Sequence, residues 1–532
     1  MIGSSRQKLQ SGPDVDLCGK REESGEDLDG GTPLSKRWCM SEKPRRLLVA
    51  AAACVTVIVA AGCGGSTKSS AGGGIGSSGA ELVTSGALAY ASIDSNLGSS
   101  RWQQLDKLLQ KFPIRDQLLT KLKSALAEKN LDYEHDVKPA LGSELDVAAV
   151  AGASSQQEAS YIAFTKPDSI EKAKALVSKL DSGPPAPATR VVDGWFVVAE
   201  KEAMIDAVLK GSGSSLADDA AFKDGFGSLP DDAVAKAYAN GPQLTKLVNS
   251  LSGATTAAFD TTQPKLDWLA ASLVPEDNGL KLDVDVKSPD ASDFTGDPYS
   301  SKLISGVPAD AIAFLSFHGN SAQNQLSRLR QNPMFSMALA EIERELGMSL
   351  DSVYALFEHE VAFYVRRGAG LPEFSLVLEE PDTEQALTTL DRLGVRVAKL
   401  AHAQLGTEQQ GGLEVKTLNF GPVTARWAGF DGRVLITTSP TGIDDYRSGG
   451  DKLADDSTYK DALSVAGAPD KTLGLVYLNL GDAVELIKSY AGLSGDKLPP
   501  EVMENLKPLH SFVAYGDRNG DITKGTAFLE VK

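Results

Sequence analysis

The feature of this sequence that most constrains its fold is an internal repeat. Residues 216–224 read LADDAAFKD, and residues 453–461 read LADDSTYKD. Other pairs recur in the same order: ALAY at 87–90 with AIAF at 311–314, KPD at 166–168 with EPD at 380–382, Asp193-Gly194 with Asp431-Gly432, and Asn278-Gly279 with Asn519-Gly520. Repetition in a constant order indicates duplication of a whole structural unit. We therefore predict two related halves, at residues 81–300 and 301–532.

The repeated turns and their flanking residues predict antiparallel strands. Asp-Gly and Asn-Gly suit the two positive-φ positions of a type I′ turn, which joins tight hairpins. Residues 280–286 read LKLDVDV, in which apolar and charged residues alternate. Alternation of this kind predicts a sheet with a buried apolar face and a charged face in water.

The segments between the predicted strands have the apolar periodicity of helices. Leucines recur with helical periodicity over residues 105–112 and again over 118–126, after Pro113, and Pro333 divides the corresponding region of the second half. Each half then reads as strand, helices, two strands, helix, hairpin, helix, strand and closing hairpin. The predicted fold class is α+β, with two tandem related halves. Each is an antiparallel sheet with packed helices, a ferredoxin-like βαββαβ opening and extra hairpins.

Residues 40–63, MSEKPRRLLVAAAACVTVIVAAGC, have the order of a secretory signal. Basic residues precede a 16-residue apolar run, which ends in small residues before Cys63. A membrane span needs about 20 apolar residues, so this run is short for one. The cysteine makes the segment resemble a bacterial lipoprotein signal, which implies cleavage after Gly62 and acylation of Cys63. Ala60 stands where such signals usually carry Leu, Val or Ile. Cleavage without lipid and an uncleaved anchor stay open.

The segments on either side of this signal lack any apolar period. Residues 1–39 are polar and charged, so they are either a disordered extension or a mis-assigned start, with translation beginning at Met40. Residues 63–80 comprise the acylated cysteine and a Gly/Ser linker. The predicted location is the outer face of the cytoplasmic membrane, with the folded part held through lipid on Cys63.

Cysteine usage and charge exclude several classes of function. All four cysteines lie at or before Cys63, so the predicted mature chain has no disulfide, thiolate nucleophile or cysteine-ligated zinc. The net charge is −18, which repels nucleic acid and anionic headgroups. The expected partners are the membrane, through the lipid, and an envelope protein. The sequence does not identify a ligand.

Candidate site residues are few, and each has a structural interpretation. The histidines are scattered, so no metal or other cofactor is expected. In the repeated block, Asp218 and Asp219, or Asp455 and Asp456, could bind a ligand, although Asp before a short helix is also a typical N-cap. His318 follows an apolar strand, near where the first half has Asp94 and Ser95. Glu360 aligns with Glu144 at the start of a strand.

The signal, the opening strands (TSGALAYASID and VPADAIAFLSF), the LADD block and the duplicated layout resemble a family of exported bacterial proteins. That family is known only as a domain of unknown function, so the resemblance implies no activity and no catalytic residue. No nucleophile elbow or phosphate loop is present. We therefore expect a lipid-anchored, non-catalytic binding or scaffold protein of the cell envelope. The alternatives are a solute-binding lipoprotein of a transporter and an envelope enzyme with a carboxylate site.

Overall fold

The computed structural model describes residues 76–151, 159–180, 185–252, 265–319, 326–327, 330, 333–493 and 498–532, all within the unit Leu47–Lys532. The predicted signal, Gly62, Cys63 and most of the linker lie outside the described residues. None of the helices in the described part is both long and apolar enough to span a bilayer.

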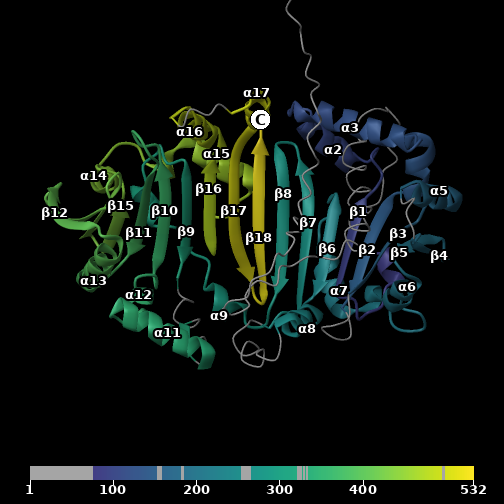
Figure 1. Ribbon diagram of the computed structural model, residues 1–532, viewed down its shortest axis with the longest axis horizontal. Helices are drawn as coiled ribbons and strands as arrows, with labels where there is room; N and C mark the ends of the chain where they lie inside the picture. Colours follow the sequence, from purple (N-terminus) through teal and green to yellow (C-terminus); the bar gives the residue numbers. More distant parts are fainter. Residues whose placement is uncertain are drawn as a thin grey trace, which may run out of the picture. The chain divides into compact units, whose positions relative to one another are not determined.

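The described strands form one sheet of 18 members, all of whose pairs are antiparallel (Figure 1). The strands are β1 (Ala89–Asp94), β2 (Glu144–Val150), β3 (Ser160–Thr165), β4 (Ala188–Val192), β5 (Trp195–Ala199), β6 (Ala235–Asn240), β7 (Trp268–Glu276), β8 (Gly279–Lys287), β9 (Ala313–His318), β10 (Glu360–Arg366), β11 (Glu373–Glu379), β12 (Gln404–Gln410), β13 (Leu413–Asn419), β14 (Thr424–Phe430), β15 (Arg433–Thr437), β16 (Gly474–Asn479), β17 (Leu509–Asn519) and β18 (Ile522–Val531).

Strand pairing divides the sheet into two arrays with the same order. The first array runs β4-β5-β3-β2-β1-β6-β7-β8. The second runs β14-β15-β11-β10-β9-β16-β17-β18 and carries an additional hairpin, β12–β13, beside β14. The arrays join through β8 and β18, centred on Asp283 opposite Thr526. The element order is the one predicted from the repeat; the exact boundary at residues 300 and 301 stays a prediction.

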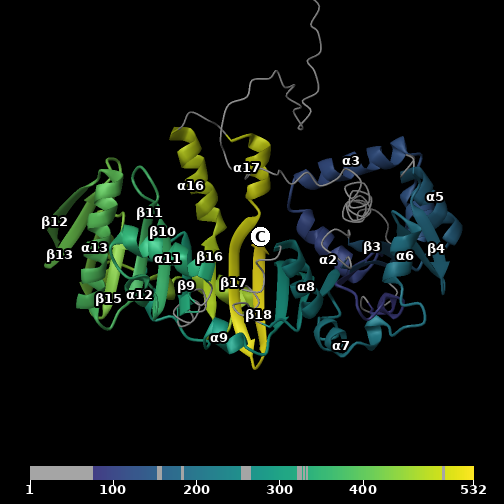
Figure 2. The same ribbon diagram turned by 60° about the horizontal axis from the view of Figure 1, so that its bottom comes forward.

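Helices connect the strands at the expected places. They are α2 (Ser100–Leu109), α3 (Ile114–Glu128), α4 (Lys138–Leu141), α5 (Ile170–Leu180), α6 (Glu202–Val208), α7 (Ala220–Phe226), α8 (Gly241–Ser252), α9 (Ala291–Thr295), α11 (Pro333–Leu346), α12 (Leu350–Ala355), α13 (Thr383–Ala401), α14 (Gly442–Arg447), α15 (Ser457–Ala466), α16 (Leu480–Leu493) and α17 (Pro500–Leu506). In Figure 2, α2, α3 and α5 accompany the first array, and α11, α12 and α13 accompany the second. The chain is thus α+β, as predicted.

Each array buries an aromatic core under short helices. In the first array Tyr90, Phe222 and Trp268 belong to one cluster with residues of α6 and α7. In the second array Phe314 and Tyr477 occupy the corresponding place under α14 and α15. Two smaller clusters lie elsewhere. One is formed by α2–α5 with part of the first array, and the other by Leu356, which follows α12, and by α13 with part of the second array.

The predicted type I′ turns are present in one hairpin of each array. Asp193 and Gly194 have φ of 50° and 83°, and Asp431 and Gly432 have φ of 49° and 71°. The prediction for Asn278-Gly279 was wrong, because Glu276 pairs with Gly279 and the turn residues are Asp277 and Asn278. The prediction for Asn519-Gly520 was wrong in the opposite direction: the turn lies one residue later, at 520 and 521, because Asn519 pairs with Ile522.

The prediction that β8 directs its charged residues into water was also wrong. Leu282 is 42% exposed, whereas its neighbour Asp283 is only 4% exposed. Asp283 accepts a hydrogen bond from Thr526 Oγ1 at 2.6 Å, on the side of the sheet that carries the aromatic cores. The alternation does place apolar and charged residues on opposite sides of β8, as predicted, but the apolar side is the accessible one.

Candidate functional site

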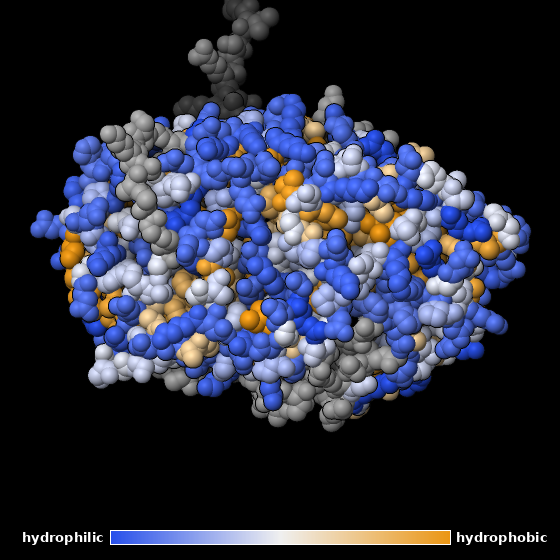
Figure 3. Space-filling view, turned by 180° about the vertical axis from the view of Figure 1, so that it is seen from behind, coloured by the Kyte–Doolittle hydropathy of each residue, from blue (hydrophilic) through white to orange (hydrophobic). Residues whose placement is uncertain are grey.

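The side of the central strands that carries Leu282 is apolar across both arrays, and we call it the open face. One row of cross-strand neighbours on it runs Leu315, Val476, Ala514, Ala527, Leu282, Leu273 and Ala235. Phe317, in the next row, is 40% exposed. In Figure 1 no helix is drawn across β9, β16, β17, β18 and β8, whereas the opposite side, in Figure 3, is mostly hydrophilic with apolar residues in separate patches.

Three glycines lie side by side on this face, and we call the depression over them the glycine trough. Gly474 is paired with Gly516, and Gly516 with Gly525, on β16, β17 and β18. None of the three has a positive φ. A Cβ built on Gly525 would come no closer than 3.9 Å to any neighbour, the backbone oxygen of Val284. Since neither conformation nor crowding requires glycine at Gly525, the missing side chain leaves open space there. At Gly516 and Gly474 the depression is shallower, because a Cβ would lie 3.3 Å from Leu473 Cβ and 3.2 Å from the Ser316 carbonyl oxygen.

Glycine inside a strand is unfavourable by about 0.5–1 kcal/mol relative to alanine, and it commonly marks a place where a ligand or another backbone approaches. The trough opens into a groove of about 550 Å³ whose lining contains no charged residue. Small-molecule sites are usually concave, mostly apolar and about 300–1,000 Å³ in volume. The groove has the size and chemistry to hold a hydrocarbon group.

In the first array the equivalent positions carry larger side chains, of which Leu273 is packed beneath helices while Leu282 stays accessible. Ala235, Leu273 and Leu282 occupy the places of the three glycines, by the register of β6, β7 and β8. Helix α2 packs on β7, and Leu273 joins the cluster beneath α2–α5. The described residues of α11, in the second array, make no comparable contact with β17.

Asp94, at the end of β1, holds α2 in place. Its carboxylate accepts hydrogen bonds from Ser99 Oγ at 2.6 Å and Arg101 Nε at 2.7 Å. The Trp102 indole donates to the Asp94 carbonyl at 2.6 Å. Asp94 is 1% exposed, so this is a buried ion pair that fixes the first turn of α2.

His318 occupies the position of Asp94 in the second array. Both residues end the strand opposite a glutamate, Glu144 for Asp94 and Glu360 for His318. His318 Nδ1 is buried without a hydrogen-bond partner among the described residues. Burial is the main cause that lowers the pKa of this imidazole. Its ring contacts Tyr299 edge-on, with centroids 5.4 Å apart.

The aspartates of the repeated block make local contacts that stabilise short helices. Asp219 accepts a hydrogen bond from Phe222 N, and Asp456 one from Tyr459 N, both at 2.9 Å. Asp218 accepts from Ser215 Oγ at 2.6 Å, and Asp455 lies 3.3 Å from Lys460 Nζ. Among the described residues no group of three or more His, Cys, Asp or Glu is placed to hold a metal ion. Ligand binding by these aspartates stays a hypothesis.

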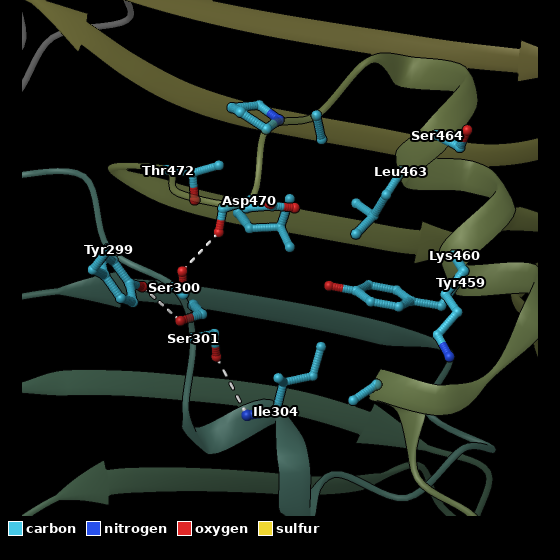
Figure 4. Close-up of a pocket in the computed structure, with 15 residues that line it drawn as sticks. Tyr299, Ser300, Ser301, Ile304, Tyr459, Lys460, Leu463, Ser464, Asp470 and Thr472 are labelled. Atoms are coloured by element: carbon cyan, nitrogen blue, oxygen red, sulfur yellow. Dashed lines mark hydrogen bonds between the residues drawn. The ribbon is translucent and has the colours of Figure 1, made fainter.

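A second cavity, of about 420 Å³, lies between β9, β16 and α15 (Figure 4). Its polar groups are largely paired with each other. Tyr299 Oη lies 2.6 Å from Ser316 Oγ, and Ser300 Oγ donates to the Asp470 carbonyl at 2.9 Å. A polar solute would have to break these bonds, so the cavity gives the solute-binding alternative no specific support.

A third, smaller cavity of about 180 Å³ is acidic. Glu358, Glu380 and Asp382 line it beside α12 and α13. Glu380 is 7% exposed, and its Oε1 has no hydrogen-bond partner among the described residues. Burial, assisted by Glu358 and Asp382, raises the pKa of Glu380 to about 7. Sequence reasoning aligned this residue with Lys166 but did not detect its burial.

The glycine trough was not detected from sequence either. A signal was present, because Gly474, Gly516 and Gly525 each stand inside a strand-like segment. Isolated glycines in strands suggest close approach of another group. Finding that all three meet requires the pairing of β16, β17 and β18, which are separated by helices and a hairpin.

Fold and site define a duplicated α+β protein in which the described residues leave an accessible apolar groove on the open face, in the middle of a single antiparallel sheet. The chain belongs to the DUF3352 family, described as a protein of unknown function, and matches it over residues 47–192 and 176–530. The two matches agree with the predicted internal duplication.

Comparison with other proteins adds little about function. No curated protein matches the chain. Among solved structures, crystal form IV of TP0453 is similar, with 11% identity, 43% of this chain and 93% of that chain covered, and a TM-score of 0.22. Crystal form III of TP0453 has 11% identity, covers 44% of this chain and 93% of its own, and gives a TM-score of 0.23. Similarity this weak carries no conclusion about what the chain binds.

Proposed function

We propose that this protein is a lipid-anchored, extracytoplasmic and non-catalytic binding protein of the cell envelope, which holds an apolar ligand on the open face. The observation that carries the proposal is the groove over the glycine trough, which is accessible, apolar and free of charged lining residues. Burying apolar surface gains about 25 cal/mol per Å², so an accessible apolar groove favours binding of hydrocarbon. The anchor rests on the Cys63 motif.

The binding part is tested with Nile red, an apolar dye whose emission rises when it leaves water. Leu282→Asp places a charge on the open face and should reduce dye binding at least about tenfold, since burying an unpaired carboxylate is unfavourable. Val191→Asp, at an equally exposed valine on β4 (42%), is the matched control and should bind like wild type. Equal binding by all three proteins would refute the open face as the site.

The anchoring part is tested by cell fractionation of the full chain. Wild type should sediment with membranes, and Cys63→Ala should be released, because stable attachment through lipid needs the acylated cysteine. Incorporation of a palmitate analogue into wild type alone would support acylation directly. Membrane retention of Cys63→Ala would instead favour an uncleaved anchor and refute attachment through lipid.

A further inference from the structure

We infer that the occupant of the glycine trough is a single-chain anionic amphiphile of the fatty-acid class, whose hydrocarbon chain lies along Gly474, Gly516 and Gly525 and whose carboxylate faces Arg518. The inference rests on the proposed function and adds to it the chemical class of the ligand. It combines the shape of the trough, the charge of its margin and the position of Arg518 in the sheet.

The shape of the trough selects a linear occupant. It crosses three neighbouring strands, which at about 4.8 Å per strand gives a length of about 14 Å. Successive residues on one face of a strand are about 7 Å apart, so a depression one residue wide is narrower than a helix of about 10–12 Å with its side chains. A peptide strand hydrogen-bonds at a sheet edge, not on its face. One extended hydrocarbon chain enters such a depression, and two parallel chains do not.

Arg518 supplies charge complementarity at the margin of the trough. It follows Gly516 by two residues on β17, hence lies on the same face, opposite Thr523, one of the groove residues. Its side chain is 11% exposed, and its Nη2 donates to the exposed Asp297. Nη1 is buried and has no partner among the described residues. A buried guanidinium N–H without an acceptor is unfavourable, and a ligand carboxylate would satisfy it.

The chain's own lipid is the competing source of hydrocarbon. Anchoring requires the acyl groups on Cys63 to stay in the bilayer, since a single chain binds membranes only marginally. A chain taken from Cys63 into the trough would weaken that attachment. We therefore assign the trough to a free fatty acid, and make occupation by the protein's own lipid an outcome of the test.

The test measures displacement of a fluorescent fatty acid from the full chain, wild type and Cys63→Ala, by palmitate, hexadecanol and a two-chain phospholipid. Palmitate should displace the probe from both proteins. Gly525→Val fills the trough without a clash, because the space above Gly525 is open, and should lower palmitate affinity at least about tenfold. Since it replaces a strand glycine with a β-branched residue, the same variant should unfold no more easily than wild type.

Two further variants make the result specific. Lys524→Val adds the same side chain one residue away, on the opposite side of β18, and should leave palmitate affinity within about twofold. Arg518→Gln should weaken palmitate about tenfold and leave hexadecanol unchanged, because only the acid has a carboxylate for Arg518.

The outcomes separate this inference from the proposed function. If Nile red binds in a Leu282-dependent way but palmitate does not displace the probe, the fatty-acid assignment fails and the binding function stands. If neither ligand binds, both fail. Palmitate affinity unchanged by Gly525→Val, binding only in Cys63→Ala, or equal displacement by the phospholipid would each overturn the assignment. So would a dimer that Leu282→Asp dissociates, because a second copy would then occupy the face.

Discussion

The two arrays follow the same strand order, yet one row of residues gives them opposite surfaces. The first array has Ala235, Leu273 and Leu282 where the second has three glycines. Leu273 packs under α2, whereas the glycines leave a groove of about 550 Å³. The two arrays thus share a scaffold, and a difference of side-chain volume in one row accompanies packing beneath α2 at Leu273 and an accessible groove over the glycines.

The strand ends differ in a way that accompanies this change. Asp94 binds Ser99 and Arg101 and so fixes the start of α2 over the first array. His318 stands at the same place in the second array and makes no such ion pair among the described residues. The comparison therefore predicts that the attachment of α2 and the stability of the first array depend on Asp94. The stability of the second array should depend less on His318.

The largest expected effect is that of Asp94→Ala. It leaves Arg101 buried without its partner and removes the acceptor of Ser99, so the free energy of unfolding should fall by about 3 kcal/mol. Urea denaturation gives the loss, and a red shift of Trp102 emission would report that α2 has loosened. His318→Ala is the matched variant and should lose less than about 1 kcal/mol. Similar losses in the two variants would contradict the proposed difference between the strand ends.

A second comparison concerns the glutamates opposite these strand ends. Glu360 accepts hydrogen bonds from Lys302 N at 2.8 Å, Leu303 N at 3.2 Å and Ser316 Oγ at 3.0 Å. Glu144 accepts a hydrogen bond from Ser92 Oγ at 3.1 Å, and burial raises the pKa of its carboxyl although hydrogen bonds with Ser92, the Gly76 backbone and Ser78 oppose the shift. Glu360→Gln should lower stability by about 2 kcal/mol because two backbone donors lose a charged acceptor.

Glu144→Gln is the control for that substitution and should cost less than about 1 kcal/mol, since a neutral side chain there removes a poorly solvated charge. Chemical denaturation of both variants under the same conditions measures the difference. A larger loss for Glu144→Gln would show that the first array, not the second, relies on this glutamate to hold its preceding segment.

Sequence reasoning succeeded where local chemistry decides the structure. The Asp-Gly turns at 193 and 431, the N-caps at Asp219 and Asp456, and the helices after Pro113 and at Pro333 follow from the residues themselves. The repeat then gave the same element order to both arrays. These features need no knowledge of which strands pair.

The groove on the open face could not be predicted from the sequence, because it depends on which strands pair and in what register. Alternation in β8 identified its two sides but not which one the helices cover, and Leu282 proved accessible while Asp283 is buried. Gly474, Gly516 and Gly525 meet only through the register of β16, β17 and β18. Likewise, Glu380 matched Lys166 in the repeat, but burial among other carboxylates is a property of the folded chain.

The acidic cavity beside the second array predicts a pH dependence of stability that arises from Glu380. The folded state raises the pKa of Glu380 to about 7 from an ordinary value of 4.5, so it binds the proton more tightly than the unfolded state does. Stability is then greatest below about pH 4.5 as far as this group is concerned, and falls as pH rises to about 7. Glu380→Gln should remove about 1–2 kcal/mol of that fall between pH 5 and 8, allowing for solvent screening.

Urea denaturation at several pH values measures this slope. Glu384→Gln, which removes an exposed carboxylate from the first turn of α13, is the matched control and should retain the wild-type slope. A parallel pH dependence in wild type and Glu380→Gln would show that Glu380 titrates normally in the folded protein.

The smallest expected effect tests what the arrays share. Asp193 and Asp431 both adopt positive φ in a type I′ turn, at 50° and 49°. Asp tolerates this conformation better than Ala, so Asp193→Ala and Asp431→Ala should each lower stability by about 0.5–1 kcal/mol. The two turns lie at distant hairpins, so the losses should add in the double variant. Thermal unfolding of the two single variants and the double variant measures this. Because the turns are equivalent while the surfaces differ, a loss confined to one variant would mean that the hairpins are not the common element of the repeat.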